Sequence, residues 1–317
     1  MAGHRSPPPP YRLPERPDGQ VRTYAHVPRR RPPRRSAGGT IAGLIGGLSA
    51  VLVLGALGFA GYDALTQGSA HGVAAGRPVA RKVATENRLY ASGKLVPIRC
   101  ALPKLTDEGA SMRRFMETLS DCLDASWKGQ FRRSGLGYDA PHRVFWVQPG
   151  RSPCGSYPSP GSSAFYCPAN NTMYVGLEHV VETSGGEPLS HYAVFARVIA
   201  HEYGHHVQDR AGILAYGQQE MEQGDDLART EASRRIELQA QCLAGAFLGA
   251  ERRTLPMTRL QYEAMLNDVR NRGDERQPAD QRDHGSGKHY AGWLARGFKG
   301  DGPDVCNTWT APGDDVS

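Results

Sequence analysis

Three residues of the chain have the types and the spacing to bind a metal ion and to use it. The string His201-Glu-Tyr-Gly-His205 places two imidazoles four positions apart, with Glu202 directly after the first. On a helix, positions i and i+4 lie on one face, so both imidazoles can bind the same zinc ion. Glu202 lies about 100° round the helix axis, from where it can reach a water on the metal without being a ligand. This pattern predicts metal-dependent hydrolysis by a zinc-activated water, with Glu202 as general base.

The sequence around this motif supports a buried helix. The residues before it form an apolar helical face, as expected for a helix that carries an internal site: Val194, Phe195, Val198 and Ile199. The alternative is an amphipathic helix whose histidines and glutamate are exposed. His206 lies one residue further round the helix and points off this face, so we do not count it as a ligand.

A catalytic zinc site needs a third protein ligand, and Glu237 is the best candidate. It shares one face of a second predicted helix with Gln241 and two apolar residues, so that face is directed inward. A buried carboxylate is costly unless it is paired or bound to a metal. Glu231 is the alternative ligand. It lies nearer the start of the helix, however, where the helix dipole stabilises an acid whether or not it binds a metal. The alternative to a metal-ligand role is an ion pair of Glu237 with Arg234 or Arg235, which would serve only the structure.

These candidate residues need helices and strands to position them. Hydrophobic periodicity predicts helices at about 108–130, 190–208, 225–253 and 289–298. Ser190 is the expected N-cap of the second helix. Short strands are predicted at 144–147, 165–167 and 172–175, the last two joined by a hairpin turn at 168–171.

The basic charge of the chain is confined to its N-terminal tail. The first 35 residues contain nine of the 38 basic residues but only two of the 32 acidic ones, so their net charge is +7 and the rest of the chain carries −1. A nucleic-acid-binding domain would carry its own basic face, so no nucleic-acid partner is expected. The tail also contains nine prolines, which predicts disorder. A ligand for a proline-recognising partner is the alternative.

An uncharged segment follows the tail and predicts a membrane anchor. Residues 41–62 would form a helix of about 33 Å, enough to cross a hydrocarbon core of about 30 Å. The alternative, a cleaved signal peptide, has a shorter apolar region of about 7–15 residues. Five arginines directly before Ser36 keep the tail in the cytoplasm and place the later chain outside the cell membrane. The expected organisation is a cytoplasmic tail 1–35, a single transmembrane helix 36–63, a linker 64–92 and an extracytoplasmic domain 93–317.

All six cysteines lie on the predicted outer side of the membrane. An even number of cysteines in an oxidising compartment predicts disulfides, with buried free thiols as the alternative. No CxxC pair suggests a cysteine zinc site. Loop closure favours pairing in sequence order: Cys100–Cys122, Cys154–Cys167 and Cys242–Cys306.

Three segments together resemble the bacterial putative neutral zinc metallopeptidase family. They are HEYGHHVQ at 201–208, ELQAQCLAG at 237–245 and DHGSG at 283–287, the last followed by Trp293 and Gly297-Phe298. They occur in the family's order, and the resemblance covers about 93–310. It implies an α+β, zincin-like fold with an active-site helix packed on a small sheet and a second, ligand-bearing helix. It also implies Zn²⁺ as cofactor and a peptide or protein as substrate.

The resemblance assigns roles to individual residues. It makes His201 and His205 metal ligands, Glu202 the base and Glu237 the third ligand. Similar sequences usually have an aspartate where this chain has Gln241, and an acid there can orient a ligand histidine through its second ring nitrogen. Gln241 can accept the same hydrogen bond, but without a charge.

The developing oxyanion of the substrate needs a further hydrogen-bond donor. His284 is the candidate for this catalytic role, with His289 and Tyr290 behind it. A solvated loop histidine is the alternative interpretation of His284. The run after His284-Gly285 differs from the family's usual one at Gly287 and His289, so the sequence leaves the identity of the donor open.

The sequence therefore supports two classes of function. The first is a membrane-anchored zinc metallopeptidase that hydrolyses peptide bonds outside the cytoplasmic membrane. The alternative is a catalytically weak or inactive zinc-bound surface module that binds a protein partner. Gln241 is the main support for the alternative, whereas Glu202 argues against it, because a metal scaffold needs no acid at that position.

Overall fold

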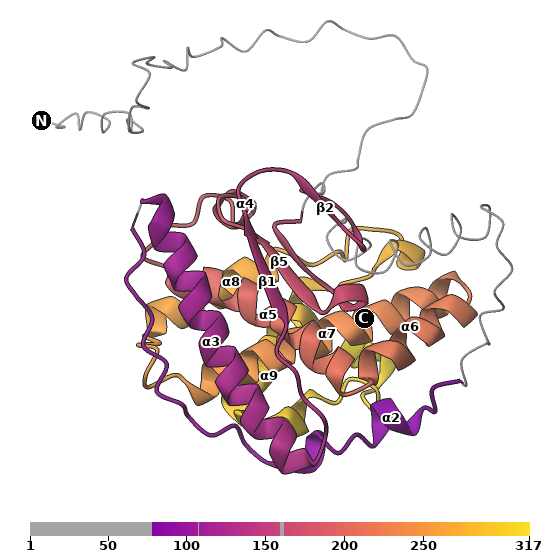
Figure 1. Ribbon diagram of the computed structural model, residues 1–317. Helices are drawn as coiled ribbons and strands as arrows, with labels where there is room; N and C mark the ends of the chain where they lie inside the picture. Colours follow the sequence, from indigo (N-terminus) through magenta and orange to yellow (C-terminus); the bar gives the residue numbers. More distant parts are fainter. Residues whose placement is uncertain (1–77, 107, 159–161) are drawn as a thin grey trace, which may run out of the picture. The chain divides into compact units, whose positions relative to one another are not determined.

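The computed structural model describes residues 78–106, 108–158 and 162–317 (Figure 1). The predicted tail, the predicted transmembrane helix and the first part of the predicted linker lie outside these residues. Within the described ranges no helix has the length and apolar character needed to span a bilayer. The described chain mixes helices with a small sheet, which confirms the α+β class.

The bounds of the elements are as follows. The helices are α2 (Lys82–Thr85), α3 (Gly109–Ser134), α4 (His179–Thr183), α5 (Tyr192–Arg210), α6 (Ile213–Gln223), α7 (Asp226–Ala250), α8 (Arg259–Arg270) and α9 (Gly287–Gly300). The strands are β1 (His142–Trp146), β2 (Gly150–Ser152), β3 (Gly155–Tyr157), β4 (Ala164–Cys167) and β5 (Thr172–Gly176). Short 3-10 turns include η1 (Tyr90–Ser92), η3 (Ala279–Gln281) and η4 (Pro303–Cys306).

The main sheet has the strand order β1-β5-β4. β5 lies in the middle, parallel to β1 and antiparallel to β4, and is buried along its whole length. The predicted hairpin between β4 and β5 is confirmed, and Asn171 ends its turn in the left-handed conformation, with φ of 47°. β2 and β3 form a separate two-stranded hairpin. β4 is therefore an edge strand of the main sheet.

Helix α5 connects the sheet to the rest of the core. It packs against β4, β5 and α3 on one side and against α7 on another. In Figure 1 it lies between α3, at the left of the domain, and α7. α7 in turn packs along α9. The string His201-Glu-Tyr-Gly-His205 has the pattern HExxH, and the predicted packing of the helix with this motif on a small sheet is thus confirmed.

The two central helices lie backbone to backbone at Gly204. A Cβ atom at this position would lie 2.7 Å from the carbonyl oxygen of Ala240 and 2.9 Å from its Cα. Distances below about 3.0 Å are too short for such contacts, so only glycine fits here without a shift of the backbone. The second variable position of the HExxH motif is therefore set by the contact between α5 and α7.

Four predicted helices are confirmed as α3, α5, α7 and α9, with ends displaced by at most four residues. The predicted N-cap Ser190 is wrong, because α5 begins after His191 and no side chain caps it. Helices α6 and α8 were not predicted. The buried residues of α6 are confined to its first five positions. Of the four buried residues of α8, two are polar. Neither helix therefore has the sustained apolar period that would predict it.

The predicted linker at 64–92 is wrong over its described part, from residue 78 onward. Ala84 in α2 and Leu89 are fully buried in the main core. The side-chain amide of Asn87 donates to the carbonyl oxygen of Ala211 at 2.9 Å. The packed domain therefore begins before residue 93, because a few apolar residues in a polar segment are enough to dock it.

The three predicted disulfides are confirmed, and no free cysteine remains in the described part of the chain: Cys100–Cys122, Cys154–Cys167 and Cys242–Cys306. The third joins the middle of α7 to η4 near the end of the chain. The side chain of Gln239 adds a hydrogen bond to the carbonyl oxygen of Cys306 at 3.0 Å.

Replacing Gly204 with alanine should lower the free energy of unfolding by about 1–3 kcal/mol, because the new methyl group forces α5 and α7 apart. Gly129 is a matched control, since it lies inside α3 and a methyl group added there would meet no neighbouring atom within 4 Å. Gly129→Ala should instead stabilise the protein by about 0.5–1 kcal/mol. Urea denaturation of both variants measures the difference, and an unchanged midpoint for Gly204→Ala would contradict the proposed constraint.

Candidate metal centre

Helices α5 and α7 bring the three expected metal ligands together. His201 and His205 lie on one face of α5, and Glu237 faces them from α7. The Nε2 atom of His201 is 3.2 Å from Oε2 of Glu237, and Nε2 of His205 is 3.5 Å from Oε1 of Glu237. All three side chains are buried. The prediction that Glu237 lies on an inward helical face is therefore correct.

These distances fit a tetrahedral metal ion. Ligand atoms that lie 2.0–2.1 Å from a zinc ion are about 3.3 Å from one another. The observed separations of 3.2 and 3.5 Å bracket that value. One ligand atom from each of the three residues falls within 4.8 Å of the others. Two imidazoles and one carboxylate are also the donor types that zinc prefers.

The protonation states of the histidines suit metal binding. Burial lowers the pKa of His205 to about 4, although the charge of Glu237 opposes this shift. Burial also lowers the pKa of His201 well below its usual value, helped by the positive charge of Arg197. Both imidazoles are therefore neutral at pH 7, which is the form that binds a metal ion.

Glu202 is buried beside the ligands, with 8% of its surface exposed. In the metal-free protein, burial and the charge of Glu237 raise the pKa of Glu202 to about 8. Arg197, the backbone of Tyr166 and His284 act in the opposite direction. A bound cation would also act to lower the pKa of Glu202, because it favours the ionised carboxylate. The carboxyl group can thus exist in either protonation state near neutral pH.

Arg197 was not singled out from the sequence. It precedes His201 by one helical turn, is buried, and forms an ion pair with Asp268 of α8. Arg272 binds the same carboxylate at 2.9 Å, so two guanidinium groups share one acid. The spacing of four residues before His201 was the available signal, since such residues share a helical face.

Gln208 orients one of the ligands and was also missed. Its side-chain Oε1 lies 3.0 Å from Nδ1 of His205. Its Nε2 donates to the carbonyl oxygen of Ile236 at 2.8 Å and to Oε1 of Gln239 at 3.0 Å. This chain of hydrogen bonds fixes the His205 ring against α7. The signal was the i+3 spacing from His205 on the same helix.

Gln241 lies beside the other ligand. It is fully buried and close enough to the His201 ring to influence its protonation. Neither polar atom of its side chain makes a hydrogen bond of normal geometry, and Nδ1 of His201 is likewise unbonded. Gln241 nevertheless lies within reach of the His201 ring, where its side chain acts to raise the pKa of His201 against the larger lowering by burial.

The alternatives to Glu237 are occupied elsewhere. Oε1 of Glu231 accepts from Arg235 at 2.8 and 3.0 Å, and its side chain is 43% exposed. Arg234 donates to the carbonyl oxygens of Val316 and Arg282. Neither arginine forms an ion pair with Glu237, so the structural reason considered for this acid does not apply.

His284 lies near the centre but is not a solvated loop histidine. Its side chain is only 12% exposed, and its Nδ1 is 2.7 Å from Oδ1 of Asp283. The ring of Tyr290 lies 5.7 Å from that of His284 and 6.1 Å from that of His201. His289 is directed elsewhere, since its Nδ1 meets the carbonyl oxygen of Ser317 at 2.5 Å. His284 and Tyr290 therefore border the centre, and His289 does not.

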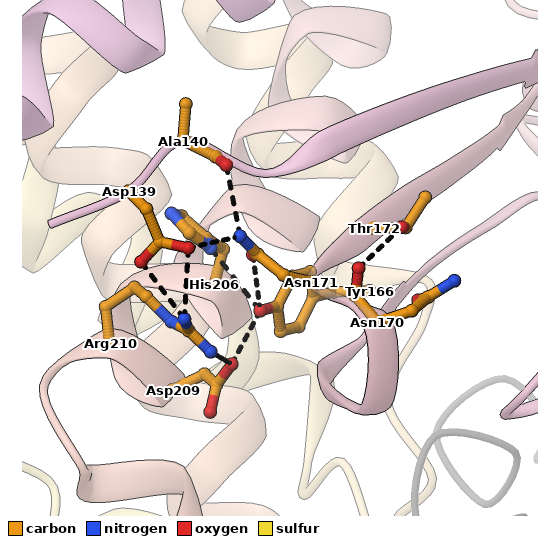
Figure 2. A network of polar contacts seen from close by, with 9 residues as sticks. All are labelled: Asp139, Ala140, Tyr166, Asn170, Asn171, Thr172, His206, Asp209 and Arg210. Atoms are coloured by element: carbon orange, nitrogen blue, oxygen red, sulfur yellow. Dashed lines mark hydrogen bonds and ion pairs between the residues drawn. The ribbon is translucent and has the colours of Figure 1, made fainter.

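A polar network ties the edge strand β4 to the end of α5 (Figure 2). The hydroxyl of Tyr166 lies 2.6 Å from Oδ2 of Asp209 and 2.9 Å from Oδ1 of Asn171, so the two acceptors share its single proton. His206 lies against the ring of Tyr166, with its Nδ1 3.4 Å from the Tyr166 hydroxyl. His206 thus lies away from the ligands, as its position in the motif predicted. Arg210 extends the network to Asp139 at 3.0 Å.

The family model that this chain matches points to the same chemistry. Residues 34–309 match the family model described as putative neutral zinc metallopeptidase. The chain is 29% identical over 274 residues to the uncharacterized protein YpfJ of Escherichia coli strain K12, which covers 83% of this chain and 86% of that protein. It is 30% identical over 235 residues to the uncharacterized proteins Mb2605 of Mycobacterium bovis and Rv2575 of Mycobacterium tuberculosis, over 64% of this chain and 74% of each relative. No solved structure matches it significantly.

The raised pKa of Glu202 predicts a pH-dependent stability of the metal-free protein. Its pKa is about 8 in the folded chain against 4.5 for a free side chain, so the folded state holds the proton more tightly. The stability contributed by this group is therefore lost as the pH rises towards 8, by up to about 1.4 kcal/mol per pH unit. Glu202→Gln does not titrate, so this metal-free variant should gain about 1–2 kcal/mol on the parent between pH 6.5 and 8.

Urea denaturation in the presence of a chelator at both pH values checks this expectation. Glu222 is the control, because it is exposed and Glu222→Gln should follow the parent at both pH values. If Glu202→Gln also follows the parent, the carboxyl group does not bind its proton as the geometry implies.

Proposed function

This chain belongs to the putative neutral zinc metallopeptidase family, and from that membership we propose that it hydrolyses peptide bonds with Glu202 as general base. The family implies Zn²⁺ as cofactor and a peptide or protein as substrate. One observation carries the proposal for this chain: His201, His205 and Glu237 converge at zinc-ligand spacing, and a buried carboxyl group that is not a ligand lies next to them. The α+β arrangement around them also supports a zincin-like fold.

The residues of the chain divide the reaction between them. His201, His205 and Glu237 would hold the metal. Bound zinc supplies a Lewis acid that polarises the substrate carbonyl and lowers the pKa of water. Glu202 takes a proton from the attacking water and returns it to the leaving amine nitrogen. Both steps require a carboxyl group that can gain and lose a proton near neutral pH. Burial raises the pKa of Glu202 to about 8, which brings its titration into that range.

His284 supplies the hydrogen-bond donor in this proposal. Negative charge develops on the carbonyl oxygen as water attacks, and a fixed donor at that oxygen stabilises it. His284 is bonded to Asp283 through Nδ1, which leaves Nε2 free to donate. Burial lowers its pKa, but the hydrogen bond to Asp283 and the charges of Glu237, Asp283 and Asp274 together raise it to about 9.

A second candidate function is a zinc-bound surface module with weak or no catalysis. The observation that favours it is the uncharged amide of Gln241, which lies beside the His201 ring. Without a charged acceptor, the His201 ring is oriented less firmly, and metal affinity can fall by 10–100-fold when such a partner is lost. The buried Glu202 favours the peptidase, because an acid that binds no metal would only destabilise a scaffold.

The full proposal places the peptidase outside the cytoplasmic membrane on a single N-terminal anchor. The support comes from the uncharged segment at 41–62, the arginines that precede it and the three disulfides, which form in oxidising compartments. This topology puts the metal centre and its substrates on the same side of the membrane.

Substitutions of the ligands and of the base should fail in different ways. His201→Ala and His205→Ala should lose both zinc and hydrolysis, and Glu237→Ala should lose most of the zinc. Glu202→Gln should keep zinc near a 1:1 ratio while hydrolysis falls by roughly 100-fold or more, because only the base is removed. Metal analysis and turnover of a quenched peptide measure the two properties on each variant.

Glu231→Gln is the control for the ligand substitutions, since Glu231 lies on the same helix but pairs with Arg235. It should keep both zinc and activity. Gln241→Asp should hold or raise zinc affinity, because it restores a charged acceptor for His201. If Glu202→Gln cleaves as fast as the parent, the proposed mechanism is wrong, and if Glu237→Ala keeps its zinc, the third ligand is another residue.

The topology predicts which end of the chain a protease can reach. Protease added to intact spheroplasts should degrade residues 93–317 and spare an epitope placed in the tail. Both ends should be degraded after lysis, which serves as the control. An intact domain in unlysed spheroplasts would show that the predicted orientation is reversed or that the domain stays in the cytoplasm.

A further inference from the structure

Two buried amide side chains connect one proposed ligand to distant parts of the domain. Oε1 of Gln208 is 3.0 Å from Nδ1 of His205, and Nε2 of Gln208 donates to Oε1 of Gln239 at 3.0 Å. Nε2 of Gln239 donates in turn to the carbonyl oxygen of Cys306 at 3.0 Å and to the hydroxyl of Tyr90 at 2.8 Å. Gln208, Gln239 and Cys306 are fully buried, so bulk water does not compete for these bonds. We call the bonds made by Gln208 and Gln239 the amide network.

The donors and acceptors of the amide network fit in only one direction. An amide oxygen accepts and an amide nitrogen donates. Both protons on Nε2 of Gln208 are engaged, one by Gln239 and the other by the carbonyl oxygen of Ile236 at 2.8 Å. Turning this amide over would set its oxygen against two oxygen acceptors. The oxygen of Gln208 therefore faces His205 and accepts a proton from Nδ1.

The far end of the amide network is anchored on two sides. Cys306 in η4 is joined to Cys242 of α7 by a disulfide. Tyr90 in η1 donates its hydroxyl proton to the carbonyl oxygen of Ala84 at 2.9 Å, which leaves its oxygen to accept from Gln239. Gln239 is therefore held both by the segment that the disulfide joins to α7 and by the segment that precedes α3.

This arrangement selects the form of His205 that binds a metal ion. A neutral imidazole carries its single proton on either nitrogen. Only the form protonated on Nδ1 leaves Nε2 open to a metal, and Nε2 is the atom that lies 3.5 Å from Oε1 of Glu237. An acceptor fixed at Nδ1 sets both the tautomer and the orientation of the ring before the metal binds. Loss of such a partner typically lowers metal affinity by about 10–100-fold.

We propose that Gln239 is a positioning residue of the metal centre, which acts through Gln208 to hold His205 in its metal-binding form. Because one acceptor of Gln239 belongs to Cys306, the disulfide with Cys242 supports the same contacts. The affinity of the centre for zinc therefore depends on residues that touch neither the metal nor the substrate. This inference rests on the proposed function, since it needs the metal centre.

Zinc affinity, measured on the full-length protein against a competing chromophoric chelator, tests the proposal without turnover. Gln239→Met keeps the length of the side chain but removes its hydrogen bonds, so the zinc dissociation constant should rise by about 10-fold. Gln208→Met should raise it at least as much. Adding Gln239→Met to Gln208→Met should have little further effect, because Gln239 acts through Gln208.

Gln261 provides a matched control for these substitutions. It is also a buried glutamine that is bonded to α5, but at the start of the helix: it accepts from the backbone N–H of Ala193 at 3.2 Å and donates to the carbonyl oxygen of Ser190 at 2.7 Å. Gln261→Met should lower the free energy of unfolding and leave the zinc dissociation constant unchanged. A rise equal to that of Gln239→Met would show that any lost amide contact to α5 weakens the centre, and would exclude the specific role.

The disulfide tests the amide network from its other end. Replacing Cys242 and Cys306 together with alanine should raise the zinc dissociation constant several-fold in the parent but change it little in Gln239→Met. Replacing Cys154 and Cys167 together is the control, since that disulfide joins the β2–β3 hairpin to β4 and should leave zinc affinity unchanged. Equal losses from both pairs would contradict the coupling through Gln239.

A spectroscopic test needs no variant that folds. Nitrogen NMR of the metal-free, full-length parent with labelled histidine should show His205 protonated on Nδ1 at pH 7. Protonation of His205 on Nε2, an unchanged dissociation constant in Gln239→Met, or losses that multiply in the double variant with Gln208→Met would each overturn the proposal. A parent that binds no zinc would instead contradict the proposed function itself.

Discussion

The arrangement of the site depends on how closely α5 and α7 approach each other. The two helices contact backbone to backbone at Gly204 and Ala240. Gly204 lies between the two histidines of the motif, and Ala240 lies three residues after Glu237. A short carboxylate side chain can reach two imidazoles on another helix only if the helix axes are this close. Gly204, which has no side chain to take part in the reaction, therefore decides whether Glu237 can reach the two histidines.

The close approach of α5 and α7 also brings two acidic side chains together in the buried interior. Glu202 and Glu237 are both buried, and the charge of Glu237 raises the cost of ionising Glu202. The chain surrounds them with compensating groups of different kinds: Arg197 on α5, His284 on the loop before α9, and two neutral imidazoles that can bind a cation. A divalent ion would neutralise the remaining negative charge. The metal-free centre is thus a set of groups that stabilise one another fully only around a cation.

Local patterns in the sequence were sufficient for the elements that carry the ligands. The HExxH spacing and the inward face of Glu237 depend on short-range helix geometry, and the pairing of the cysteines in sequence order was expected from loop closure. The structure agrees with each. Partners that arise from tertiary contacts were not predictable in this way. Asp274 lies ten residues before His284 in a polar loop, and nothing local indicates that its carboxylate accepts the His284 backbone N–H. Buried Ala84 and Leu89, together with the hydrogen bond of Asn87, dock a segment that composition alone assigned to a linker.

The disulfide between Cys242 and Cys306 has a consequence for the order in which the site assembles. It closes a loop of 64 residues that begins just after Glu237 and contains α8, the His284 loop and α9. Before oxidation, these elements must find α7 against the full conformational entropy of that loop, and afterwards they search a much smaller space. The histidine-bearing helix and the sheet lie outside the loop and have no such dependence. The three proposed ligands also lie outside it, so we expect them to come together first and the His284 loop to dock once Cys242 and Cys306 are oxidised.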